Sequence, residues 1–146
     1  MKIIKDVLAS DVIISMPTAK SHATTGVSLG MKGLMGLIWD RKYFHSSVDI
    51  NPAIAELAAT VKVSLVVLDA SRALLTAGPS GPGLIAYPET IVAGTDQVAV
   101  DAYGVTLAKW YNTGFAPRQV KHIAAAQELG LGTCNLDEVN VLKAQA

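Results

Sequence analysis

The stretch VSLVVLD, residues 63–69, predicts a buried strand that ends at Asp69. The apolar run is too short for a typical helix, is almost unbroken and is rich in β-branched valine. Strands of this kind are typical of sheets covered by helices, because both faces of the strand are withdrawn from water. The stretch therefore indicates a sheet with helices packed against it.

Two further apolar runs predict strands at residues 11–16 (DVIISM) and 89–93 (ETIVA). Three segments between and after these strands predict helices, at residues 53–61, 96–110 and 117–130. Pro52 stands at the start of the first helix, where proline is favoured, and Thr95 or Asp96 can cap the second. Gly130 stops the third helix. Weaker patterns add short helices at 3–9 and 29–38, a last strand at 139–142, and loops at 18–28, 39–51 and 77–84.

The alternation of apolar strands and helices predicts an α/β fold, with a mostly parallel sheet and helices on both faces. The 146 residues are enough for one hydrophobic core. We therefore expect a single α/β domain over residues 1–146.

The composition argues against several classes of function. Charged residues make up 16% of the chain, against about 25% in a typical domain, which favours wide burial, an oligomer or docking onto a partner. Twelve basic residues balance twelve acidic ones, so charge gives no reason to expect binding to nucleic acid or to an anionic membrane. The apolar runs are also shorter than the roughly 20 residues that span a membrane.

Cys134 is the only cysteine. The chain therefore forms no intrachain disulfide and cannot hold a four-cysteine iron–sulfur cluster by itself. The first residues do not have the pattern of a secretory signal, and we expect a cytoplasmic protein.

Polar clusters follow three of the predicted strands. Lys20 and His22 follow the first strand, Asp69 and a glycine-rich turn follow the second, and Asp96 and Asp101 follow the third. Ligands of α/β sheets bind beyond the carboxyl ends of the strands. The shared position of the clusters predicts one composite site.

The first cluster carries most of the chemistry. Lys20 and Lys32 can neutralise a carboxylate or phosphate, and His22 can transfer a proton near neutral pH or bind a metal. Closely spaced small residues let backbone N–H groups approach an anion, and these are Gly26, Ser28 and Gly30. A tightly packed glycine-rich helix with solvated lysines is the structural alternative, and spacing alone does not separate the two.

The later candidates also have structural alternatives. The turn with Gly78 and Gly81 is either a lip for an anion or a rigid connection between elements. Asp96 at a helix start is also a natural cap. Asp101 lies in an apolar helix and needs a partner if it is buried, for which a lysine of the first cluster would serve.

The other two histidines depend on how their segments fold. His45 lies in a polar stretch and gains a role as a metal ligand only if that stretch folds back over His22 and Lys32. His122 lies in an amphipathic helix beside Lys121, and we expect it to be a surface or packing residue.

The order of these residues resembles the family called domain of unknown function 362. The matching segments are residues 11–15 (DVIIS), Pro17-x-x-Lys20-x-His22, 25–28 (TGVS), 31–36 (MKGLMG), His45, Asp69, 78–81 and 93–101. Longer members of that family begin before this point, and many carry ferredoxin-like cysteines. The resemblance implies the C-terminal portion of a longer domain in a redox-associated family, without the iron–sulfur part.

A more distant similarity links the chain to the nickel-pincer lactate racemase family. It rests on the series His22, Gly26, Ser28, Gly30, Lys32, Gly36 and His45. The similarity implies that Lys32 attaches the cofactor, His45 ligates the metal and His22 is an acid/base.

We expect an enzyme domain that binds a small anion or a metal cofactor, with His22 and Lys32 as catalytic residues. One alternative is a racemase-like or isomerase-like metal enzyme. The other is a non-catalytic subunit that docks on a partner supplying the missing N-terminal part. A homo-oligomer is also expected, and the sequence does not give the substrate or the metal.

Overall fold

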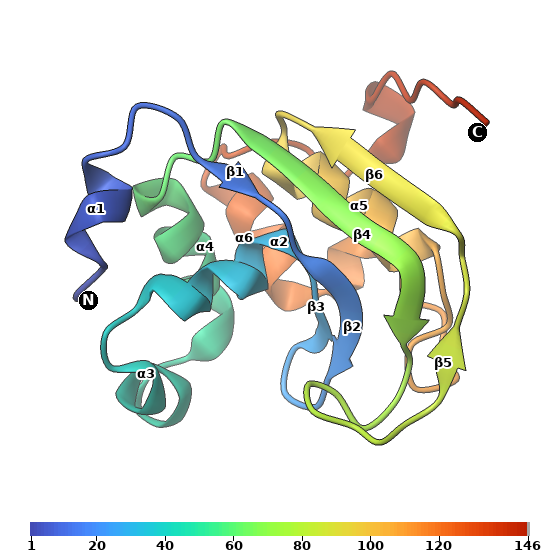
Figure 1. Cartoon of the computed structure of the whole chain (residues 1–146), viewed down its shortest axis with the longest axis horizontal. Coiled ribbons are helices and arrows are strands. Elements are labelled where there is room, and N and C mark those ends of the chain that lie inside the picture. Colours follow the sequence, from blue (N-terminus) through green and yellow to red (C-terminus); the bar gives the residue numbers. More distant parts are fainter. Residues whose placement is uncertain (146) are drawn as a thin grey trace.

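Strand β4 (Leu65–Leu74) is the longest strand and the centre of a six-stranded sheet in the computed structural model, which describes residues 1–145 (Figure 1). The other strands are β1 (Ile14–Ser15), β2 (Thr18–His22), β3 (Gly26–Ser28), β5 (Ile85–Ala86) and β6 (Thr90–Gly94). The α-helices are α1 (Lys5–Leu8), α2 (Gly30–Gly33), α3 (Arg41–Ser47), α4 (Ile50–Thr60), α5 (Gln97–Thr106) and α6 (Lys121–Glu128). Three short 3-10 helices complete the fold: η1 (Leu34–Leu37), η2 (Pro117–Gln119) and η3 (Leu136–Glu138).

The sheet is built outward from both edges of β4. Strands β1 and β2 follow one another along one edge and run parallel to it, with Ile14 opposite Leu65 and Thr18 opposite Asp69. Strands β6 and β5 run antiparallel along the other edge, and β3 forms an antiparallel hairpin with β2. The predicted α/β class is confirmed, with parallel pairing of β4 to both β1 and β2.

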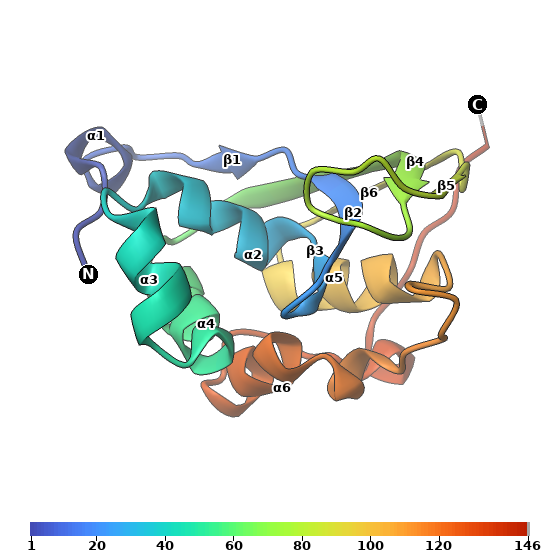
Figure 2. The same ribbon diagram turned by 90° about the horizontal axis from the view of Figure 1, so that it is seen from below.

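The buried side of β4 faces the helices. Val66, Leu68 and Ala70 alternate along the strand and are almost completely buried, as expected for one face of a pleated strand. Figure 2 shows α2 and α5 directly beneath the sheet, with α4 and α6 farther from it. The core fills the space between these layers, and Ile54 of α4 and Ile123 of α6 are fully buried in it.

The opposite side of the sheet has no helical layer in Figure 2, although the sequence interpretation placed helices on both faces. Ile14 and Ile91 are 56% and 59% exposed, and Met16, next to β1, is 76% exposed. Apolar side chains therefore remain in contact with water on this side.

Two segments that were predicted as loops are ordered elements instead. Residues 18–28 form β2 and β3, because β2 pairs with β4 on one side and with β3 on the other. Residues 39–51 contain α3 and the start of α4, and Asp40 caps α3 by accepting a hydrogen bond from the backbone nitrogen of Tyr43 at 3.0 Å.

Two other predicted elements differ at the C-terminal end. The helix predicted for 117–130 begins as η2 and continues as α6. Residues 139–142, predicted as a strand, pair with no strand in the described chain. Within residues 1–145, no helix combines the length and apolar character needed to cross a membrane.

Candidate functional site

The hairpin of β2 and β3 places Lys20, His22 and Ser28 on one surface. Lys20 lies opposite Ser28 in the hairpin, and His22 lies opposite Gly26. Side chains two positions apart on a strand point to the same face, so Lys20 and His22 share a side. Gly26 adopts a positive φ of 77° where the hairpin turns, a conformation that favours glycine.

Lys32 is positioned by Asp101 of the neighbouring helix α5. The Asp101 carboxylate accepts hydrogen bonds from the backbone nitrogens of Gly30 at 2.7 Å and Met31 at 3.0 Å. These bonds tie the first turn of α2 to α5, and Lys32 follows in the same turn. Backbone N–H groups are therefore the partners of Asp101, rather than a lysine as expected from the sequence.

Helix α3 brings His45 against His22. The two imidazole rings are stacked, with centroids 5.5 Å apart and an interplanar angle of 19°. The segment that carries His45 thus folds back over His22, as the sequence hypothesis required for a role of His45. Arg41, Lys42 and Ser46 of the same helix face the same cavity.

These elements line an open cavity of about 570 Å³. Four lysine or arginine side chains and two histidines line it, and its lining has no carboxylate side chain. The lining residues are Lys20, His22, Ser28, Lys32, Gly33, Met35, Gly36, Arg41, Lys42, His45, Ser46 and Pro79. We call this cavity the basic pocket. It concentrates positive charge in a chain whose formal net charge is zero.

The electrostatics of the basic pocket disfavour further positive charge. Burial, together with the charges of Lys32, His45 and Lys20, lowers the pKa of His22 to about 4. Burial and the charge of Lys20 lower the pKa of Lys32 to about 8, and burial and Lys32 also lower the pKa of His45. A bound anion would relieve this repulsion, because it favours the protonated form of each group.

The hydrogen bonds of His22 indicate its tautomer. At neutral pH a ring with a pKa near 4 is neutral and carries one N–H. The backbone nitrogen of Thr24 donates to Nδ1 of His22 at 3.3 Å, which assigns the ring proton to Nε2. The neutral ring can therefore donate one hydrogen bond from Nε2.

The glycine-rich turn contributes to the rim of the basic pocket. The backbone nitrogen of Gly78 donates to Oγ of Ser21 at 3.1 Å, which holds the turn against β2. A Cβ at Gly78 would overlap the carbonyl group of Ser21, so this contact requires glycine. Pro79 lines the pocket, whereas Gly78 and Gly81 do not.

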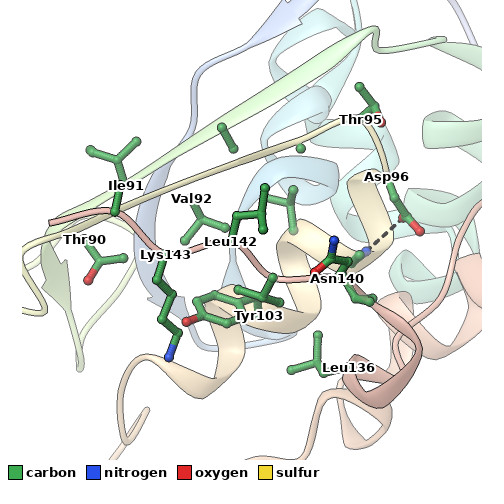
Figure 3. A pocket seen from close by; sticks show the side chains of 17 residues that line it. Thr90, Ile91, Val92, Thr95, Asp96, Tyr103, Leu136, Asn140, Leu142 and Lys143 are labelled. Atoms are coloured by element: carbon green, nitrogen blue, oxygen red, sulfur yellow. Dashed lines mark hydrogen bonds between the residues drawn. The ribbon is translucent and has the colours of Figure 1, made fainter.

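Asp96 lies outside the basic pocket. It caps α5 by accepting hydrogen bonds from the backbone nitrogens of Val98 and Ala99 at 2.8 and 2.9 Å, and it also accepts one from Thr133 at 3.0 Å. Figure 3 shows it at one end of a different cavity of about 620 Å³, along which Tyr103 and Leu142 lie. The structure therefore assigns Asp96 the role of a cap.

Burial of the Asp101 carboxyl group is the main cause of its raised pKa. The residue is completely buried and lines neither cavity. Burial raises the pKa of Asp101 to about 7, although the hydrogen bonds from Met31 and Gly30 act in the opposite direction. Its hydrogen bonds anchor α2.

Two cationic residues of the pocket, Arg41 and Lys42, were not singled out from the sequence. They stand four and three positions before His45. Residues three and four apart share a face of a helix. If residues 41–47 are helical, this spacing therefore predicts that Arg41 and Lys42 face the same cavity as His45.

His122, expected at the surface or in packing, is completely buried, and neither ring nitrogen has a hydrogen-bond partner among residues 1–145. Burial, with Lys32 and His22 nearby, lowers its pKa to about 4.

Metal-binding side chains do not cluster within residues 1–145. No group of three or more His, Cys, Asp or Glu side chains comes together there in a way that could hold a metal ion. His22 and His45 are the two such side chains that meet in the basic pocket.

Comparison with known proteins gives one match. No curated protein and no solved structure matches the chain. A family model described as Domain of unknown function (DUF362) matches residues 1–106, which include every residue that lines the basic pocket. The chain therefore belongs to the DUF362 family.

Proposed function

We propose that the basic pocket binds a small molecule through a carboxylate or phosphate group. The observation that carries the proposal is the lining itself, in which four cationic side chains and two histidines surround about 570 Å³ with no carboxylate among them. Cations brought together without an acidic partner repel one another. A ligand with negative charge supplies the missing partner.

The inner part of the pocket is suited to hold one anionic group. Lys32 is only 7% exposed and His22 only 5% exposed, so hydrogen bonds from them to an anion would be weakly screened by water. Lys32 and Lys20 would supply charge, and neutral His22 would donate from Nε2. Hydrogen bonds to charged groups contribute about 1.5–3 kcal/mol each.

The proposal extends to proton transfer at the bound molecule. A catalytic acid or base works best when its pKa lies near the operating pH. The pKa of Lys32, about 8, meets this condition in the free pocket, and a bound anion raises the pKa of His22 from about 4 toward neutral pH. We therefore assign both Lys32 and His22 as candidate acid/base residues, and both can also donate a hydrogen bond to the anionic group.

The metal-cofactor alternative has less support from the residues present. The described chain brings two histidines together in the pocket, short of three metal-binding side chains. For this reason the proposal rests on the anion and includes no metal-dependent step.

Isothermal titration with inorganic phosphate and with acetate tests the proposal. The wild type should bind at least one of them, and Lys32→Gln and Lys20→Gln should each weaken binding about tenfold or more. Lys62→Gln is the matched control, because Lys62 is exposed and lies outside the pocket lining. Absence of binding to the wild type, or equal losses in all three variants, would refute the proposal. Thermal unfolding of each variant verifies that it is folded.

A further inference from the structure

The basic pocket has two groups of cations that differ in depth. Lys32 is buried and Lys20 is half-buried, and they come from α2 and β2. Arg41 and Lys42 are exposed and come from α3. Both groups line the same cavity.

Each group of cations has one histidine on the same element. His22 follows Lys20 on β2, and His45 follows Arg41 and Lys42 on α3. Because the two rings stack on each other, the contact joins the inner element to the outer one. The stacked pair therefore brings α3, with its cations, next to the strand that carries Lys20.

One carboxylate or one phosphate does not match this arrangement. Pockets of 300–1,000 Å³ typically hold ligands of many atoms, and the basic pocket has about 570 Å³. The inner lysines and His22 are enough for a single anionic group. Arg41 and Lys42 then remain without an anionic partner in the lining.

We infer that the ligand carries two separate anionic groups, one held by Lys20 and Lys32 and the other by Arg41 and Lys42. This inference rests on the proposed function, because it names the chemical class of ligand for the same pocket. The guanidinium of Arg41 can hold a carboxylate or phosphate with two parallel hydrogen bonds. Small dicarboxylates and molecules with both a carboxylate and a phosphate belong to this class.

The experiment must distinguish a ligand with two anionic groups from a single anionic group that carries a charge of about −2. Sulfate and succinate both carry a charge near −2 at neutral pH, but sulfate has one anionic centre and succinate has two. Titration calorimetry at constant ionic strength should give an affinity for succinate or glutarate at least tenfold above that for sulfate. Equal affinities for sulfate and both dicarboxylates would overturn the inference.

A double variant tests the assignment of the outer group. Arg41→Gln/Lys42→Gln should remove the preference for the dicarboxylates and change the affinity for sulfate less than threefold. Lys5→Gln/Lys62→Gln removes the same charge from exposed positions outside the pocket and should keep the preference. A preference that survives in Arg41→Gln/Lys42→Gln would refute the role of the outer group. Failure of the wild type to bind any of these anions would instead refute the proposed function.

Discussion

The carboxylate of Asp101 accepts a hydrogen bond from the backbone nitrogen of Gly30 at 2.7 Å, across 71 positions of the sequence. This bond joins the middle of α5 to the first residue of α2 and lies beneath the turn that carries Lys32. Glycine permits the approach, because a Cβ at position 30 would lie 2.8 Å from Oδ1 of Asp101 and 3.3 Å from a methyl group of Val66. The position of Lys32 therefore depends on residues that do not contact the pocket.

Gly30→Ala should destabilise the domain by about 1–3 kcal/mol, because the added methyl group displaces a buried carboxylate or the central strand. Denaturant unfolding measures this change. Gly114→Ala is the matched control, since a Cβ there meets no atom within 4 Å, and its effect should stay below about 1 kcal/mol. Similar stabilities for the two variants would show that the contact with Asp101 does not constrain position 30.

Asp101→Asn should cost about 1–3 kcal/mol, because the amide NH2 group faces a backbone N–H and leaves it without an acceptor. The same variant should weaken binding of phosphate or acetate, since α2 and Lys32 lose their anchor. Asp11→Asn makes the same chemical change at an exposed position and should alter neither property. If Asp101→Asn is folded and still binds phosphate or acetate like the wild type, the hydrogen bonds of Asp101 do not position Lys32.

Anion binding should weaken as pH rises from 7 to 9. Lys32 is protonated below its pKa of about 8 and loses its charge above it, so the pocket becomes less positive over this range. We expect a loss of about tenfold in affinity. Titration calorimetry at several pH values measures the profile. Lys32→Met should bind weakly at every pH and lack this step, and a wild-type affinity that stays constant to pH 9.5 would contradict the assignment.

The central strand and the main helices were predictable because their signals are local. The run VSLVVL is apolar except for Ser64, and the cap at Asp96 precedes a helix whose side chains are mostly buried. These patterns depend on few neighbours. The fold class followed from their order.

The hairpin and α3 were not predictable from local patterns. The residues TAKSH have weak strand propensity, and they form β2 because β4 and β3 pair with both of its edges. The contact between His22 and His45 depends on both of these elements. Lys20, His22, Lys32 and His45 could thus be proposed as one site from sequence, but Arg41 and Lys42 could not.

His122 should make the protein less stable in acid. Its pKa is about 4 in the folded chain, against 6.5 for an ordinary histidine, so the unfolded chain binds more protons between these values. The free energy of unfolding therefore falls as pH decreases from 6.5 to 4, by about 3 kcal/mol for a shift of this size.

The variant His122→Leu isolates this contribution. Both ring nitrogens of His122 are buried without a hydrogen-bond partner in the part of the chain that the structure describes, so an apolar side chain of similar volume should be neutral or stabilising at pH 7. The advantage of His122→Leu over the wild type should then grow as pH falls, because the variant has no imidazole to protonate at this position. His22 and Asp101 titrate in both proteins, and their effects cancel in the difference. Urea unfolding of both proteins at pH 7, 6, 5 and 4.5 measures this difference in the free energy of unfolding. A variant that is less stable than the wild type by more than about 1 kcal/mol at pH 7 would show instead that the buried imidazole has a partner that stabilises the fold.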